Sequence, residues 1–222
     1  MATDVAAILP LPTTLAESAL APLAGQAPVL RLARTMVGRA VIVAAEPVAD
    51  VLRKTLAAQG LSAVDVAVTE EPGTRAGYLA AGLQYLKEQP RHVLIYDVRR
   101  PLTPATLRDR VIAALDAGTP AVMPVLAVTD SVKAVDGRGS VTGTLDRTTL
   151  RSVQYPRGFT VAHLSQLLAQ RTSDEFDELD ESLRAGAPIT FVDGDADAFV
   201  VELPRDAAFV EAIIARRNPV GG

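Results

Sequence analysis

Residues 93–104, VLIYDVRRPLTP, place a charged motif directly after an apolar run. The run lacks the polar alternation of a half-exposed strand, so it predicts a strand buried on both faces of a parallel sheet. Asp97, Arg99 and Arg100 would then follow the carboxyl end of that strand, where open α/β sheets bind ligands. The alternative is that the Asp97 carboxylate only caps the turn that follows the strand.

Similar apolar runs occur on both sides of this stretch and alternate with helical patterns. The expected strands are 5–9, 40–45, 64–68, 92–96 and 121–125, and the expected helices are 46–60, 74–89 and 103–118. We expect Thr103 to cap the third helix. This alternation predicts βαβ units in a doubly wound, mostly parallel α/β sheet. Towards the C-terminus we expect a helix in 173–186, strands at 189–195 and 198–203, and a closing helix over 204–217.

Residues 127–155 interrupt this alternation. Strand-like pieces flank the DGRG and TGT turns, which suit a hairpin. We therefore expect a projecting β-arm on a single domain spanning residues 1–222. An isolated hairpin is only marginally stable, so the arm predicts a homodimer. The alternative is an ordinary surface excursion.

The composition excludes several classes of function. The chain has 222 residues, a net charge of −4, no Trp and no cysteine. Without stacking aromatics or a Lys/Arg run, a nucleic-acid partner is disfavoured. Without cysteine there is no disulfide or thiolate nucleophile, and two histidines argue against a zinc site. No basic residue precedes Arg31 and no apolar run is long enough to span a membrane, so we expect a cytoplasmic protein with no membrane partner.

Four ordered motifs carry a family resemblance, which extends over about residues 73–200. They are TRAGYLAAGL (74–83), VLIYDVRRPLTP (93–104), PVLAVTDSVKAVD (124–136) and TLDRTTLRSVQYPRGF (144–159). Together they resemble the methylerythritol-phosphate cytidylyltransferase family. The resemblance implies a Rossmann-like nucleotidyltransferase fold with a dimerisation arm. It also implies CTP and Mg²⁺ as cofactors, and transfer of CMP to a sugar-alcohol phosphate in isoprenoid biosynthesis.

The resemblance assigns roles to residues at the strand end and beside it. The family's HDAARP appears here as YDVRRP. Asp97 then matches the catalytic, metal-binding aspartate, and Arg100 matches an arginine near the substrate. Arg75 matches an arginine that opens the helix beside the nucleotide site.

The resemblance also assigns roles to residues on the arm. The family's DTxK appears as DSVK, which makes Ser131 and Lys133 candidate substrate-binding residues beside Asp130. Arg147 matches a catalytic arm residue that reaches the substrate phosphate of the neighbouring subunit. The alternative for Lys133 and Arg147 is a role in salt bridges at a dimer interface.

The first thirty residues depart from the family pattern. Family members carry PAAGxGxR…PK after their first strand, whereas residues 10–30 here have neither that Gly-rich loop nor any Lys or Arg. A hydrogen bond from Arg or Lys to a charged group contributes about 1.5–3 kcal/mol, so this loss predicts much weaker binding of CTP. Tyr78, Phe176 and Val200 replace the family's serine, threonine and lysine on the nucleotide side. The family's TPQ becomes Tyr155, Pro and Arg157.

Two functions remain open at this point. One is a divergent member with impaired or lost catalysis, which binds a small phosphorylated ligand or a protein partner, including a catalytic family member. The alternative is an active nucleotidyltransferase with a remodelled nucleotide site.

Two further charged features have interpretations that involve no function. Arg99 and Arg100 can be solvated cations that pair with Asp109 or Asp116. The acidic run 174–181 is more typical of a solubilising helix face than of a metal site.

Overall fold

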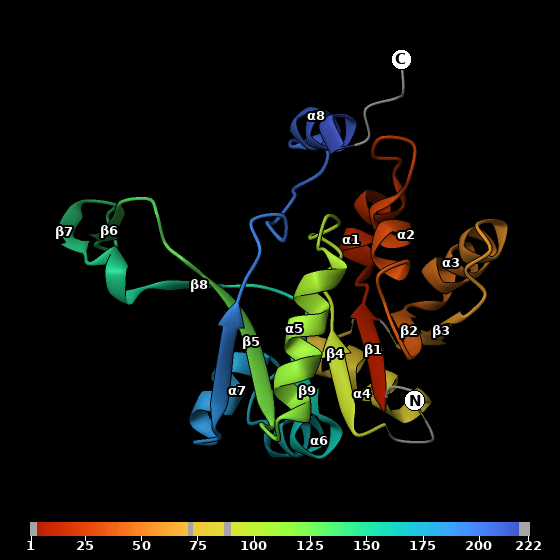
Figure 1. Ribbon diagram of the computed structural model, residues 1–222, viewed down its shortest axis with the longest axis horizontal. Coiled ribbons are helices and arrows are strands. Elements are labelled where there is room, and N and C mark those ends of the chain that lie inside the picture. Colours follow the sequence, from red (N-terminus) through yellow and green to blue (C-terminus); the bar gives the residue numbers. More distant parts are fainter. Residues whose placement is uncertain (1–3, 71–72, 87–89, 218–222) are drawn as a thin grey trace.

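The structure is a computed structural model that describes residues 4–70, 73–86 and 90–217. Its centre is an eight-stranded sheet with the order β10-β5-β9-β4-β1-β2-β3, in which β8 also pairs with β5 (Figure 1). The strands are β1 (Val5–Pro10), β2 (Arg39–Ala44), β3 (Val64–Val68), β4 (His92–Ile95), β5 (Ala121–Ala127), β8 (Arg151–Val153), β9 (Arg157–Thr160) and β10 (Ile189–Asp193). The strands β1 to β4 are parallel, and β9 lies antiparallel between β4 and β5. The mostly parallel sheet is confirmed, and β9 is a strand that the sequence patterns did not predict.

Helices cover both faces of this sheet. Val5, Ala7 and Leu9 of β1 belong to one core cluster with α1 (Thr13–Leu20), α2 (Pro28–Ala33), α3 (Glu46–Ala58) and α5 (Ala105–Asp116). The intervening residues Ala6 and Ile8 belong to a second cluster with α4 (Arg75–Tyr85) and α6 (Val161–Gln170). Successive side chains of a strand point to opposite faces, so this division shows the expected doubly wound arrangement.

Glycines set how closely two helices approach the sheet. A Cβ atom on Gly82 of α4 would lie 2.8 Å from Ile8 Cγ2 of β1. A Cβ atom on Gly158 of β9 would lie 2.5 Å from Val111 Cγ1 of α5. Larger residues at these two positions would push the layers apart.

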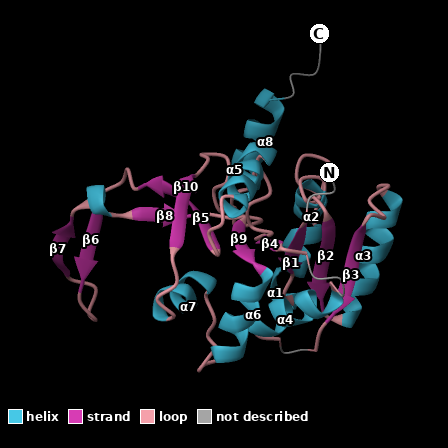
Figure 2. Ribbon diagram, turned by 60° about the horizontal axis from the view of Figure 1, so that its bottom comes forward, coloured by secondary structure: helices cyan, strands magenta, loops and turns pink. Residues whose placement is uncertain are grey.

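The β-arm is a separate two-stranded sheet of β6 (Val132–Val135) and β7 (Val141–Leu145). It projects from the end of β5 and returns through β8, as Figures 1 and 2 show. At its tip, Asp136 Oδ1 accepts hydrogen bonds from the backbone N–H groups of Arg138 and Ser140. The hairpin predicted for this stretch is therefore present.

Three element boundaries differ from the sequence prediction. The helix expected over 74–89 ends at Tyr85 as α4, and residues 87–89 lie outside the described part of the chain. The helix expected in 173–186 begins only at Glu178, as α7 (Glu178–Arg184), because Asp177 is its N-cap. Pro104, not Thr103, is the N-cap of α5, since the Thr103 hydroxyl instead donates to the carbonyl of Arg100.

The segment 198–203 is not a strand. It crosses the end of β4, where the Val201 N–H donates to the carbonyl of Arg99 at 2.7 Å. It then leads into α8 (Ala207–Arg217), whose Val210 and Ile214 pack against Leu23 and Val201. The C-terminal part of the chain therefore covers the region that follows Asp97. In the described parts of the chain, no helix is long and apolar enough to cross a membrane.

Candidate functional site

Asp97 lies two residues beyond β4 and is 7% exposed. Its Oδ1 atom accepts hydrogen bonds from the backbone N–H of Arg99 and from Arg99 Nε, both at 3.0 Å. Its Oδ2 atom accepts a hydrogen bond from Arg99 Nη2 at 2.7 Å. Asp97 therefore does cap the turn, and Arg99 also holds its carboxylate in a two-pronged ion pair.

Arg99 also determines the charge state of Asp97. Burial alone would raise the pKa of the Asp97 carboxyl, but hydrogen bonds and charge from Arg99 lower that pKa below its ordinary value. Asp97 is therefore an ionised carboxylate that is already paired with a guanidinium. Arg99 is half exposed, as the alternative of a solvated cation expected, but its partner is Asp97 and not Asp109 or Asp116.

A Mg²⁺ ion does not fit Asp97 in this arrangement. Three N–H groups already occupy the carboxylate. Within the described ranges, no group of three or more His, Asp or Glu residues is placed to hold a metal ion. A small cavity beside Arg99, which Asp97 does not line, measures about 10 Å³ and has room for one water molecule at most. No step of chemistry is assigned to a metal at this position.

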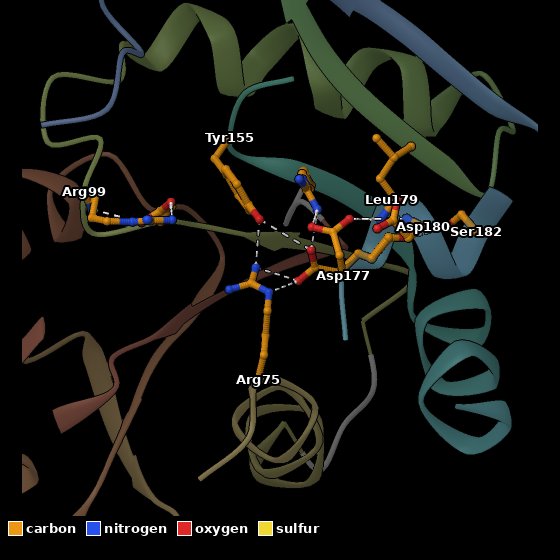
Figure 3. A network of polar contacts seen from close by, with 10 residues as sticks. Arg75, Arg99, Tyr155, Asp177, Leu179, Asp180 and Ser182 are labelled. Atoms are coloured by element: carbon orange, nitrogen blue, oxygen red, sulfur yellow. Dashed lines mark hydrogen bonds and ion pairs between the residues drawn. The ribbon is translucent and has the colours of Figure 1, made fainter. Parts of the chain in front are cut away.

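A second ion-pair network lies close by and centres on Glu178 (Figure 3). Glu178 is 0% exposed. Its Oε1 accepts a hydrogen bond from Arg75 Nε at 2.7 Å and forms an ion pair with Arg75 Nη2 at 2.6 Å. Its Oε2 accepts a hydrogen bond from Arg157 Nη1 at 2.6 Å. Asp177 Oδ2 binds the same Arg157 Nη1 at 2.8 Å. One buried carboxylate thus connects the beginnings of α4, β9 and α7.

Tyr155 stands among the arginines of this region. Its hydroxyl accepts a hydrogen bond from Arg75 Nη2 at 3.0 Å, and burial raises the pKa of the phenol, which therefore stays protonated. The ring centroid lies 4.4 Å from Arg157 Cζ, 5.5 Å from Arg75 Cζ and 5.7 Å from Arg100 Cζ. These distances are within the range of cation–π attraction.

Arg75 is committed to this network. Burial alone would lower the pKa of Arg75, but Glu178 raises that pKa above its ordinary value, as expected for a tightly paired guanidinium. The interpretation of the acidic run as a solubilising face is wrong for Glu178 and also for Glu181, because both are buried. Arg75 lies beside the strand ends as expected, but it is already paired with the Glu178 carboxylate.

Arg100 is buried, and its guanidinium donates hydrogen bonds to backbone carbonyl groups. Its Nη1 donates to the carbonyl of Ala198, and its Nη2 donates to the carbonyl of Val153 at 3.3 Å. These bonds join the strand-end turn to the C-terminal segment and to β8. Burial lowers the pKa of Arg100. The alternative pairing of Arg100 with Asp109 or Asp116 is therefore wrong as well.

The candidate residues of the arm lie apart from this cluster. Ser131 is exposed just before β6, and Lys133 Nζ donates to Thr144 Oγ1 across the hairpin at 2.7 Å. Arg147 Nη1 donates to the carbonyl of Thr129 at the base of the arm. Arg75 and Arg100 lie at the Tyr155 ring and within electrostatic reach of Asp97. The other three residues belong to the arm, which projects away from the central sheet (Figure 1). Their substrate-binding roles stay predictions.

The segment that replaces the family's Gly-rich loop folds as α1 and α2. Ala19 and Pro28 from this segment line the small cavity beside Arg99, and Leu23 is fully buried against α8. This segment packs beside the strand-end turn, in which Arg99 stays half exposed. Tyr78, which stands at the nucleotide-side serine position, is 1% exposed within the core.

A larger depression lies beyond the ends of β2 and β3. It has a volume of about 590 Å³ and is lined by Thr13, Ala45, Glu46, Pro47, Val48, Thr69 and Glu70. Two carboxylates line it, and none of these lining residues is a Lys or Arg. Such a lining repels a nucleotide triphosphate.

The sequence reasoning missed the partners Arg99, Arg157 and Glu178. Arg99 stands where the family motif has alanine, and Arg157 stands where TPQ has glutamine. Each departure adds a cation beside a strand end. Arg157 is buried there, and a buried charge requires a counter-charge. That requirement was the available signal for a carboxylate partner.

Replacement of Glu178 with Gln tests the network. The change leaves Arg75 and Arg157 without their shared carboxylate, so the free energy of unfolding should fall by about 3 kcal/mol. The matched control is Glu202→Gln, which breaks a pair with Arg205 in which both side chains are more than half exposed. The control should cost about 1 kcal/mol or less. Urea denaturation measures both values, and equal losses would contradict the assigned role of Glu178.

Comparisons with known proteins place the chain in a family. The family model for 2-C-methyl-D-erythritol 4-phosphate cytidylyltransferase, IspD, matches residues 19–216. The enzyme of that name from Rhodococcus opacus is 34% identical over 178 residues, which cover 80% of this chain and 76% of the relative. The one from Streptomyces coelicolor is 33% identical over 215 residues, which cover 91% and 80%. The crystal structure of the Thermus thermophilus enzyme has a TM-score of 0.71 and 26% identity, with 93% of this chain and 97% of that chain covered. By sequence and by fold, the chain belongs to the IspD family of 2-C-methyl-D-erythritol 4-phosphate cytidylyltransferases.

Proposed function

We propose that this chain is a non-catalytic member of the IspD family, which keeps the fold and assembles with a second chain through its β-arm. The pair between Asp97 and Arg99 carries the first half of this proposal. The residue expected to bind the metal is buried and instead binds the half-exposed guanidinium of Arg99 from its own chain.

The charge distribution on the nucleotide side supports the same conclusion. A complex of CTP with Mg²⁺ is an anion, and Glu46 and Glu70 line the large depression beyond the strand ends. Arg75 already directs its Nε and Nη2 atoms at Glu178 and Tyr155. The charge of Glu178 offsets that of Arg75, which weakens the attraction of Arg75 for a phosphate.

The arm supports the second half of the proposal. Val135 and Val141 lie opposite each other in the hairpin and are 59% and 65% exposed. Leu145 is also exposed. A two-stranded sheet with exposed apolar side chains gains stability when a second surface covers it. We propose that a second copy of the chain provides this surface, giving a homodimer.

One observation favours a catalytic family member as another partner. Ser131, Lys133 and Arg147 match the arm motifs of the family, although this chain lacks the family's Gly-rich loop on the nucleotide side. In a mixed dimer, the arm could present these residues to a phosphorylated acceptor held by the other chain.

Titration calorimetry with CTP tests the loss of nucleotide binding. We expect no saturable heat at millimolar CTP, with or without Mg²⁺, because the cationic groups are internally paired. The cytidylyltransferase of Rhodococcus opacus serves as the comparison in the same buffer. A dissociation constant in the micromolar range for this chain would instead support the alternative, an active enzyme with a remodelled nucleotide site.

Replacement of Val141 with Asp tests assembly through the arm. A charge at a covered apolar position should weaken the dimer at least about tenfold, because it would be buried without a partner. The matched control is Val51→Asp on α3, where the valine is also exposed. Sedimentation equilibrium measures the dissociation constants. Equal effects of the two variants, or a monomeric unaltered chain, would rule out a homodimer formed by the arm.

A further inference from the structure

Arg99 has an unusual position relative to Asp97. The two residues lie in one turn, closed by a hydrogen bond of 3.0 Å from the Arg100 N–H to the Asp97 carbonyl. This turn directs the Arg99 side chain back onto the carboxylate two residues earlier. The matching family motif has alanine at this position, so the guanidinium is an addition to the motif.

The other arginines nearby are occupied. Arg100 donates to backbone carbonyls, and Arg75 is paired with Glu178. Within the described ranges, Arg99 is the residue whose hydrogen bonds reach the Asp97 carboxylate. A carboxylate that is 7% exposed requires such a partner, since an isolated buried charge is strongly unfavourable.

The pair also excludes a metal ion. Oδ1 accepts two N–H groups and Oδ2 accepts one, which leaves few lone-pair positions on the carboxylate. Mg²⁺ binds oxygen ligands at about 2.0–2.1 Å, so an ion on Oδ2 would lie next to the guanidinium. The two positive charges would repel each other.

We infer that the Arg99 guanidinium is a tethered cation that takes the place of a divalent metal ion at Asp97. The turn after β4 is then held in shape without metal, and removal of Arg99 makes that turn dependent on a divalent cation. The inference extends the proposed loss of catalysis, because it names the group that replaces the metal.

Thermal unfolding in EDTA and in millimolar Mn²⁺ tests the inference on the full chain. The unaltered protein should show the same midpoint in both conditions. Arg99→Ala should have a lower midpoint in EDTA, and Mn²⁺ should raise it by about 2–4 °C because the ion binds the freed carboxylate. Arg99→Lys retains a cation and should remain insensitive to Mn²⁺.

The matched control is Arg53→Ala, which breaks an exposed pair with Asp50 and should gain no response to Mn²⁺. A midpoint of the unaltered protein that rises with Mn²⁺ as much as that of Arg99→Ala would overturn the inference. An Arg99→Ala variant whose unfolding midpoint does not rise in Mn²⁺ would also overturn the inference.

A second measurement covers the case in which Arg99→Ala does not fold. Bound Mn²⁺ broadens the amide signals of nearby residues in NMR spectra. Signals from residues 97–102 of the unaltered protein should stay sharp in millimolar Mn²⁺, and selective broadening there would overturn the inference. Binding of CTP without any metal would contradict the proposed function. It would not contradict the inference that Arg99 takes the place of a metal ion.

Discussion

The Glu178 carboxylate is fully buried and accepts hydrogen bonds from Arg75 at the start of α4 and from Arg157 at the start of β9. Because it belongs to the first residue of α7, it joins three elements that are far apart in the sequence. A carboxylate can be buried here only because two guanidinium groups surround it. This requirement fixes Arg75 and Arg157 in place, and the ring of Tyr155 packs against both.

The same constraint operates a short distance away, at Asp97 and Arg99. In both places a group that could have bound part of a nucleotide complex is neutralised by a residue of the same chain. The apolar segment of α1 and α2 packs beside the turn, and a cavity of about 10 Å³ lies between them. Charge pairing and apolar packing together account for the internal contacts of this strand-end region, on a fold that usually holds a ligand at this edge.

The fold was largely predictable from the sequence, because buried strands, amphipathic helices and the hairpin turns have local signatures. β9 escaped prediction because four residues, one of them glycine, carry little pattern. The segment 198–203 was wrongly predicted as a strand, since its apolar residues pack over the end of β4 instead of joining the sheet. The positions of Asp97, Arg75 and Arg100 followed from motif resemblance. Their partners did not, because Arg75 and Glu178 are 103 positions apart and only the folded chain brings them together.

A crystal structure determined in the presence of saturating CTP and Mg²⁺ addresses the internal pairing most directly. If internal ion pairs occupy the site, Arg99 will still contact Asp97 and Arg75 will still contact Glu178. No ordered triphosphate will then lie at the ends of β1 and β4. An ordered triphosphate with a metal ion on Asp97, and Arg99 turned away, would contradict the claim that internal ion pairs close this site.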